Sequence, residues 1–126
     1  MFIPIIIGAV LYMLYGGIYY SILLSDKQAD KNKDIQLHQT EGAMKYITSV
    51  LIAFISSTLV AIAIKQTGLD TITGGLSIGL LLGIIISLVY LKNALFGLMP
   101  RRSLYIAIGD HLVIFTLLGL LHGWLA

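Results

Sequence analysis

The sequence predicts an all-α integral membrane protein, a four-helix bundle with up-down-up-down topology and both termini outside. Composition supports this fold class, because 58% of the 126 residues are hydrophobic and only 11% are charged. Soluble domains are about half apolar and about a quarter charged, so this chain has too few charges to coat a soluble surface. The chain also contains four long apolar runs, and about 20 apolar residues are enough to cross a bilayer as a helix. We expect one membrane domain over residues 1–126.

The four apolar runs predict helices, because only helices or closed barrels satisfy every backbone hydrogen bond in lipid. Runs of this length also lack the alternation that marks strands. Gly68 is expected to cap the second helix at its C-terminus, and Asp70 or Thr71 to cap the third at its N-terminus. Pro100 is expected to break the third helix. The helices are expected at about residues 2–24, 46–64, 74–96 and 103–125, with a polar cytoplasmic loop at 25–45.

The positions of the basic residues predict the orientation. Of the eight Lys and Arg residues, only Lys65 lies on one side of the predicted membrane. The others lie in the loop at 25–45 or close to the turn at Pro100. Cytoplasmic loops are rich in Lys and Arg, so we expect these two segments in the cytoplasm of a cell-membrane protein. A bias this strong also argues against insertion in two orientations.

Small residues recur at every fourth position on two consecutive predicted helices, a spacing that allows close approach of helices in membranes. We expect the two series to pack against each other within one chain, because a short connection makes their helices neighbours. The alternative is that the glycine series forms a subunit interface. The fourth helix carries Gly119 and Gly123 at the same spacing. The two series are Ser49, Ala53, Ser57 and Ala61 on the second helix, and Gly75, Gly79, Gly83 and Ser87 on the third.

The end of the first predicted helix carries a motif, GGIYYSILLSDK, at residues 16–27. It resembles the hallmark Gly-Ala-Leu-Trp-Tyr-Ser-Pro-Leu-Leu-Phe-Gly-Lys of a family of small bacterial membrane proteins called domain of unknown function 1761. Tyr19 stands where the family has Trp, Ile22 where it has Pro, and Ser25-Asp26 where it has Phe-Gly. The length and the four-helix layout also agree. The resemblance implies a fold and a bacterial membrane location but no reaction. The matching residues are Gly16, Tyr20, Ser21, Leu23, Leu24 and Lys27.

Asp110 and His111 lie inside the fourth predicted helix, about two turns from its cytoplasmic end. Ionisable groups are costly in a membrane and are functional candidates by default. A carboxylate beside an imidazole can relay protons or bind a cation; the alternative is that Asp110 is structural, either neutral or paired. We expect Asp110 to pair with Lys92, because both lie about 10 Å from the predicted cytoplasmic border. Asn93 is the alternative partner.

Tyrosines form a stripe along the first predicted helix. Tyr12 and Tyr15 lie near the middle of the membrane, where each hydroxyl group needs a hydrogen-bonding partner. They could line a ligand cavity, although such a stripe more often packs against another helix with one hydrogen bond between them. Tyr19 and Tyr20 fit an aromatic belt at the inner interface.

The remaining polar residues predict contacts with lipid. Arg101 and Arg102 are expected at the membrane surface, where they favour anionic headgroups. His122 and Trp124 are expected at the outer interface. His111 and His122 are about 16 Å apart along one helix, too far to share a metal ion. We expect no metal, no cofactor and no nucleic-acid partner, since the chain has no cysteine and a net charge of only +2.

Three functions fit these features, and the sparse chemistry favours the first. The first is a non-enzymatic membrane protein that forms a homo-oligomer or serves as a partner subunit. The second is a transporter or channel for a small solute or ion that uses Asp110 and His111. The third is a membrane enzyme that acts on lipid. A dry interior would favour the non-enzymatic protein. A polar path to Asp110 from both sides would favour the transporter or channel, and an opening to lipid near Asp110 and Arg101 would favour the enzyme.

Overall fold

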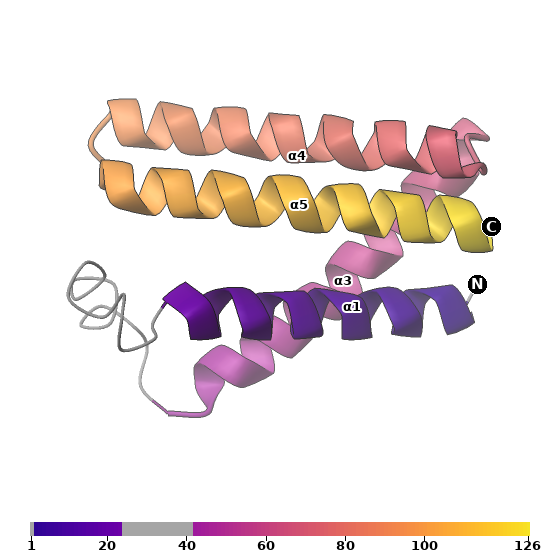
Figure 1. Cartoon of the computed structure of the whole chain (residues 1–126), viewed down its shortest axis with the longest axis horizontal. Coiled ribbons are helices and arrows are strands. Elements are labelled where there is room, and N and C mark those ends of the chain that lie inside the picture. The colour runs from indigo at the N-terminus through magenta and orange to yellow at the C-terminus, as the bar shows by residue number, and fades with distance from the viewer. Residues whose placement is uncertain (1, 24–41) are drawn as a thin grey trace.

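Four helices make up the described part of the computed structural model, which comprises residues 2–23 and 42–126 (Figure 1). Each is long and apolar enough to cross a membrane. This confirms the predicted all-α fold with four spanning helices, and the chain is a multi-pass membrane protein. Most of the predicted loop at 25–45 lies outside the described residues. The helices are α1 (Phe2–Leu23), α3 (Met44–Thr67), α4 (Ile72–Leu95) and α5 (Arg101–Leu125).

The helices differ in how closely they run together. In Figure 1, α4 and α5 lie side by side along their whole length, and α1 lies on the other side of α5. The third element, α3, crosses obliquely behind α1, so that its first half lies away from α4 and α5. The two chain ends lie at the same end of the molecule. Which side of a membrane this end faces stays a prediction.

The connection between α3 and α4 has the predicted caps. Gly68 follows α3 in the left-handed region, with φ 69°, a conformation that glycine adopts without steric cost. Thr71 is the residue before α4, and its hydroxyl oxygen accepts a hydrogen bond from the Gly74 N–H at 3.0 Å. Both caps were predictable because they depend only on local sequence.

The connection between α4 and α5 differs from the prediction that Pro100 breaks the third helix. The last residue of α4 is Leu95, and Gly97 has φ 80°. The Leu98 N–H then donates to the Asn93 carbonyl at 2.8 Å. These are the features of a Schellman ending, in which a left-handed glycine closes the last turn. Pro100 therefore begins α5 as its N-cap.

The glycine series of α4 packs against α5, and the prediction that it packs against α3 is wrong. A Cβ on Gly75 would overlap the carbonyl oxygen of Gly119, and a Cβ on Gly79 would overlap that of Phe115. Because of its oblique course, α3 makes little contact with α4. A short connection brought the ends of α3 and α4 together without aligning the two helices.

The main neighbour of α3 is α1 instead, and Ser57 of the α3 series contacts both α1 and α5. Ala53, Ser57 and Ala61 are buried. The ends of the two predicted series do not follow the pattern. Ser49 is exposed, and Ser87 is half-buried with its hydroxyl bonded to a carbonyl of its own helix at 2.7 Å.

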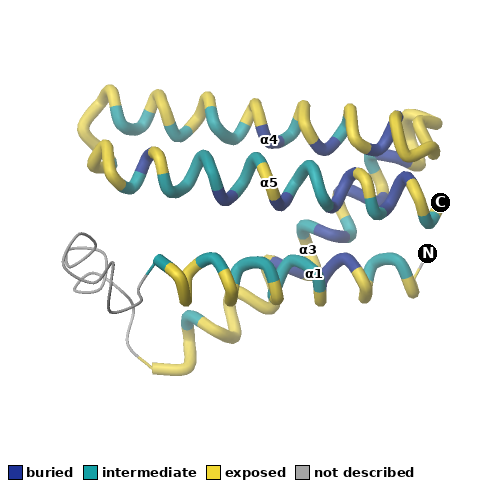
Figure 2. The backbone as a smooth tube through the Cα atoms, viewed as in Figure 1, coloured by how far each residue is buried: buried dark blue, intermediate teal, exposed yellow. Residues whose placement is uncertain are grey.

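A small apolar core lies between α3 and α5. Its fully enclosed members are Val60, Ile64 and Leu118, and half-buried side chains from α1, α4 and α5 pack around them. Most outward-facing residues of all four helices are exposed (Figure 2). Many of these exposed side chains are large and apolar, as expected for surfaces in contact with lipid. The half-buried side chains around the core are Tyr12, Ile78, Leu82 and Phe115.

Candidate functional site

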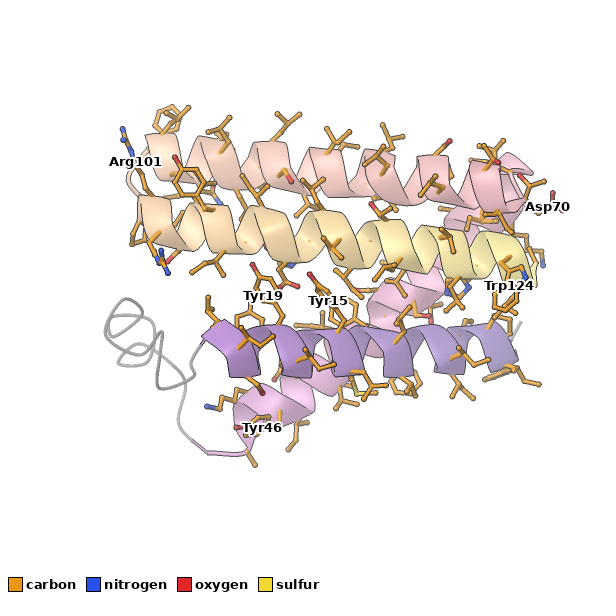
Figure 3. All side chains as sticks on the ribbon, viewed as in Figure 1. Tyr15, Tyr19, Tyr46, Asp70, Arg101 and Trp124 are labelled. Carbon is orange, nitrogen blue, oxygen red and sulfur yellow. The ribbon has the colours of Figure 1, made fainter. Side chains whose placement is uncertain are left out.

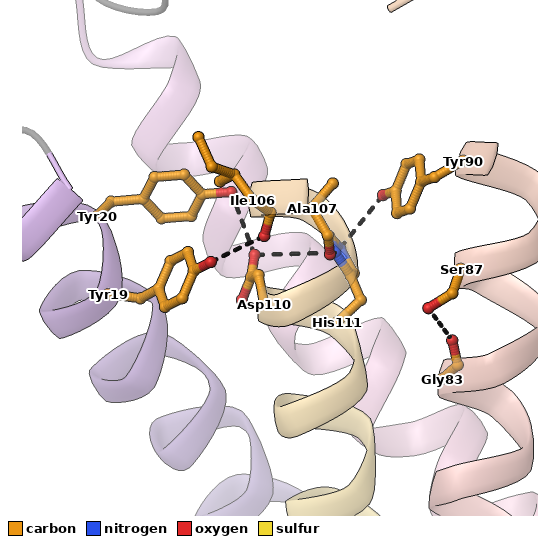
Figure 4. Close-up of polar contacts among 9 residues, drawn as sticks. All are labelled: Tyr19, Tyr20, Gly83, Ser87, Tyr90, Ile106, Ala107, Asp110 and His111. Carbon is orange, nitrogen blue, oxygen red and sulfur yellow. Dashed lines mark hydrogen bonds and ion pairs between the residues drawn. The ribbon is translucent and has the colours of Figure 1, made fainter. Parts of the chain in front are cut away.

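Asp110 lies on the inner face of α5, where only 8% of the residue is exposed. The Tyr20 hydroxyl of α1 donates a hydrogen bond to its carboxylate oxygen Oδ2 at 3.1 Å (Figure 4). The same oxygen lies 3.8 Å from Nδ1 of His111. The carboxylate is thus held between α1 and its neighbour on α5. No hydrogen bond reaches its other oxygen, Oδ1, from the residues that the structure describes.

The ring of His111 continues this polar group toward α4. Its Nδ1 lies 2.8 Å from the carbonyl oxygen of Ala107. A carbonyl oxygen only accepts hydrogen bonds, so Nδ1 carries a proton. In the neutral ring, Nε2 is then an acceptor, and the Tyr90 hydroxyl of α4 donates to it at 3.3 Å. A row of polar groups therefore links α1, α5 and α4 through Tyr20, Asp110, His111 and Tyr90.

A cleft of about 800 Å³ opens beside this row, between α1, α3 and α5. Asp110 and His111 form one wall, and side chains from the first half of α3 form another. The wall from α1 includes two glycines, Gly16 and Gly17, and a Cβ added to either would meet nothing within 4 Å. The cleft is therefore wide where these residues face it. Its lining is Tyr12, Met13, Gly16, Gly17, Tyr20, Ser21, Lys45, Tyr46, Ser49, Val50, Ile52, Asp110, His111 and Ile114.

The tyrosines of α1 take different roles. Tyr12 lines the cleft and packs its ring edge-on against Phe115. Tyr15 stacks on Tyr19, with ring centroids 5.7 Å apart. The Tyr19 hydroxyl donates to the carbonyl of Ile106 on α5 at 2.9 Å, and Figure 3 shows Tyr15 and Tyr19 pointing from α1 toward α5. Tyr19 thus joins two helices, in addition to any role in an aromatic belt.

Tyr20 is a site residue that the sequence did not identify. It was expected in the inner aromatic belt, yet its hydroxyl holds the buried carboxylate of Asp110. One signal was available, since Tyr20 and Asp110 lie at similar distances from the predicted cytoplasmic border.

Lys92 is not the partner of Asp110, and the prediction of this ion pair is wrong. Within the described residues, no ion pair reaches Asp110 from Lys92 and no hydrogen bond reaches it from the Asn93 side chain. Lys92 is exposed. At about 100° per residue, it lies about 180° around α4 from Gly83, which contacts α5. Lys92 and Asp110 were expected at the same depth in the membrane, but Lys92 points away from α5.

His122 is buried, with 4% of the residue exposed, so the prediction that it lies at the outer interface is wrong. Its Nε2 lies 2.9 Å from the Ser57 hydroxyl oxygen. The single hydroxyl proton of Ser57 goes to the Ile5 carbonyl of α1 at 2.9 Å, so Nε2 of His122 is the donor in their contact. By contrast, Trp124 is exposed near the chain end (Figure 3).

A second, smaller hollow of about 360 Å³ lies at the end of the bundle where His122 is found. It is lined by residues of α1, α3, α5 and the connection between α3 and α4, including Lys65 and Asp70. In residues 2–23 and 42–126, no three His, Asp or Glu side chains are close enough to share a metal ion. The larger cleft, with its buried carboxylate, is the stronger candidate site.

A family model described as "Protein of unknown function (DUF1761)" matches residues 3–123. The match covers nearly the whole chain and confirms the resemblance carried by the motif at the end of α1. No curated protein and no solved structure matches the chain.

Proposed function

Because the chain belongs to DUF1761, a family of unknown function, we propose a function from its own geometry: it is a non-enzymatic membrane protein that binds a small solute inside its helix bundle. The observation that carries this proposal is the 800 Å³ cleft with Asp110 in its wall. Its volume lies within the range of about 300–1,000 Å³ that is usual for small-molecule sites.

The buried carboxylate supports a binding role. An ionisable side chain inside a membrane is costly and marks a functional site by default. Asp110 has no Lys or Arg partner in the described residues, and its neighbour His111 is hydrogen-bonded as a neutral ring.

The cleft reaches one end of the bundle only. Its lining runs from Ser21 and Lys45, where α1 ends and α3 begins, to Ile114 on α5. Beyond this point, Val60 and Leu118 are fully enclosed. The arrangement supports a binding site rather than an open channel. With the orientation predicted from Lys and Arg, the cleft opens toward the cytoplasm.

The other functions have less support. The apolar outer faces could meet lipid or a second copy of the chain, so self-association and a role as partner subunit stay predictions. An opening to lipid near Asp110 and Arg101 would have favoured an enzyme acting on lipid, but Arg101 does not line the cleft. Transport would need a rearrangement of the layer around Leu118.

The first test of the proposal is whether the cleft contains water. The chain has no cysteine, so Gly16→Cys introduces a single thiol at a position where added atoms meet nothing. We expect a water-soluble, charged thiol reagent to label it, because alkylation requires access by water. The matched control is Ile18→Cys, almost at the same depth but 62% exposed and outside the cleft.

Labelling of Gly16→Cys together with protection of Ile18→Cys supports the proposal. Protection of both thiols would mean that the cleft is dry in the membrane. In that case the proposed binding function fails. Mass spectrometry of the labelled protein gives the measurement for each variant in intact membranes.

A further inference from the structure

We propose that the solute is an organic cation, whose positive charge lies next to Asp110 and whose apolar part lies among aromatic and aliphatic side chains of the cleft. This inference rests on the proposed binding function and names the chemical class of the ligand. Three properties of the cleft carry it: the carboxyl group in its wall, its aromatic rings, and its apolar walls with a recess on α1.

The deep part of the cleft carries a carboxyl group, which is negative when ionised. Among the residues that the structure describes, Asp110 is the only acidic one in the lining, and its oxygen Oδ1 has no hydrogen-bonding partner there. Its neighbour His111 uses Nδ1 to hold the Ala107 carbonyl, so the ring is satisfied without being charged. Lys92 points away. A bound cation would be the positively charged partner that the carboxylate lacks. The ion pair would offset part of the free-energy cost of burying the ionised carboxylate.

Within residues 2–23 and 42–126, the one basic side chain of the lining is Lys45, which lies in the first turn of α3 at the mouth of the cleft. Its ammonium nitrogen lies over the Tyr46 ring, 5.1 Å from the ring centroid. A lysine at the mouth favours anions there, so a test must distinguish the two charges.

Aromatic rings line the cleft that holds the carboxylate. Tyr12 and Tyr20 line the cleft from α1, and Tyr46 lines it from α3. The face of an aromatic ring attracts cations, with an energy of about 0.5–2 kcal/mol depending on exposure to water. A carboxylate in a cleft lined by aromatic rings suits a substituted ammonium or phosphonium group, because ring faces attract an organic cation without having to replace a shell of water ligands.

The rest of the lining suits a hydrocarbon group. Met13, Val50, Ile52 and Ile114 contribute apolar walls. Gly16 lies between Tyr12 and Tyr20 at helical spacing, so α1 presents a recess flanked by two rings. A ligand with a charged centre and bulky apolar substituents would fill this space.

Two probes of nearly identical size and shape but opposite charge test the proposal. Tetraphenylphosphonium is the cation and tetraphenylborate the anion. Equilibrium dialysis of the purified full chain in detergent, against micelles alone, measures both dissociation constants. We expect the cation to bind at least about 30-fold more tightly, the lower limit for one partner of a buried charge pair.

The Asp110→Asn variant should lose this preference for the cation. The matched control is Asp70→Asn, which removes the same charge at an exposed position outside the cleft, and should bind both probes as the parent does. Tyr12→Leu should weaken cation binding about two- to fivefold, as expected for the loss of one ring face. Tyr105→Leu is its control, because Tyr105 is on α5, 69% exposed and outside the cleft.

A further variant covers the case in which Asp110→Asn does not fold. Gly16→Leu places a side chain in the recess, where nothing obstructs its Cβ, and should abolish binding of the cation. Equal or tighter binding of the borate would overturn the inference, as would unchanged cation binding in Gly16→Leu. If Gly16→Cys is labelled but the phosphonium does not bind, the ligand class is wrong while the binding cleft stands. If Gly16→Cys is protected, the cleft is dry in the membrane and the proposed binding function is wrong.

Discussion

Ser57 joins three helices through one hydroxyl group. It donates to the Ile5 carbonyl of α1 and accepts from His122 of α5, both at 2.9 Å. Gly8 allows this contact, because a Cβ there would overlap the Ser57 hydroxyl. The polar groups satisfy one another at the point where α1, α3 and α5 meet. Their arrangement gives a residue-scale account of why α3 crosses α1 here.

Replacing Ser57 with alanine should destabilise the protein by about 1–3 kcal/mol, because the His122 N–H and the Ile5 carbonyl lose their partner. Unfolding by a denaturing detergent, titrated into mild micelles, measures the change. Ser49→Ala is the control, since the Ser49 hydroxyl is exposed and bonds only its own helix. Equal effects of the two substitutions would show that the buried contact contributes nothing to stability.

At the scale of elements, the pairing of α4 with α5 depends on glycine. Gly79→Ala should destabilise the protein by about 1–3 kcal/mol or more, since the added Cβ overlaps the carbonyl oxygen of Phe115 and forces the helices apart. The same detergent titration measures it. Gly17→Ala makes the same change in α1, where the Cβ meets nothing, and should be neutral or stabilising by about 0.5–1 kcal/mol. Tolerance of Gly79→Ala would mean that α4 and α5 do not pack closely.

What the sequence predicted depends on how local each feature is. The four apolar runs and the caps at Gly68 and Thr71 depend only on local sequence, and the structure agrees with these predictions. The glycine series was found by its spacing, but its partner was not, because the oblique course of α3 results from contacts such as that of Ser57 with His122. Gly119 and Gly123 of α5 have the same four-residue spacing as the glycines of α4, and this spacing indicated the correct partner helix.

The candidate site was predicted in part. Asp110 and His111 stand out as ionisable groups in an apolar run, whereas their partners depend on direction around each helix. Tyr90 lies about 20° around α4 from Gly83 and so faces α5, while Lys92 faces away. The cleft arises from the separation of α3 from α5. That separation depends on how the helices pack, so no short sequence motif predicts it.

At the scale of the whole molecule, the orientation is a prediction that labelling can test. Single cysteines at Leu98, in the exposed turn before α5, and at Ala126, after its end, lie at opposite ends of one spanning helix. In intact cells we expect an impermeant thiol reagent to label Ala126→Cys, and to label Leu98→Cys only after permeabilisation. The parent chain has no cysteine and serves as the blank. The reverse pattern would place both termini in the cytoplasm.

The enclosed layer around Val60, Ile114 and Leu118 also determines where an electrical potential falls across the protein. If water fills the cleft up to Asp110, the conducting medium extends into the bundle, and most of the voltage drops across the dry layer beyond it. A charge that enters the cleft then crosses little of the field, whereas a charge that passes Leu118 crosses most of it, at about 2.3 kcal/mol per 100 mV. Binding at Asp110 would be nearly insensitive to voltage, and any passage through the bundle would be strongly driven by it.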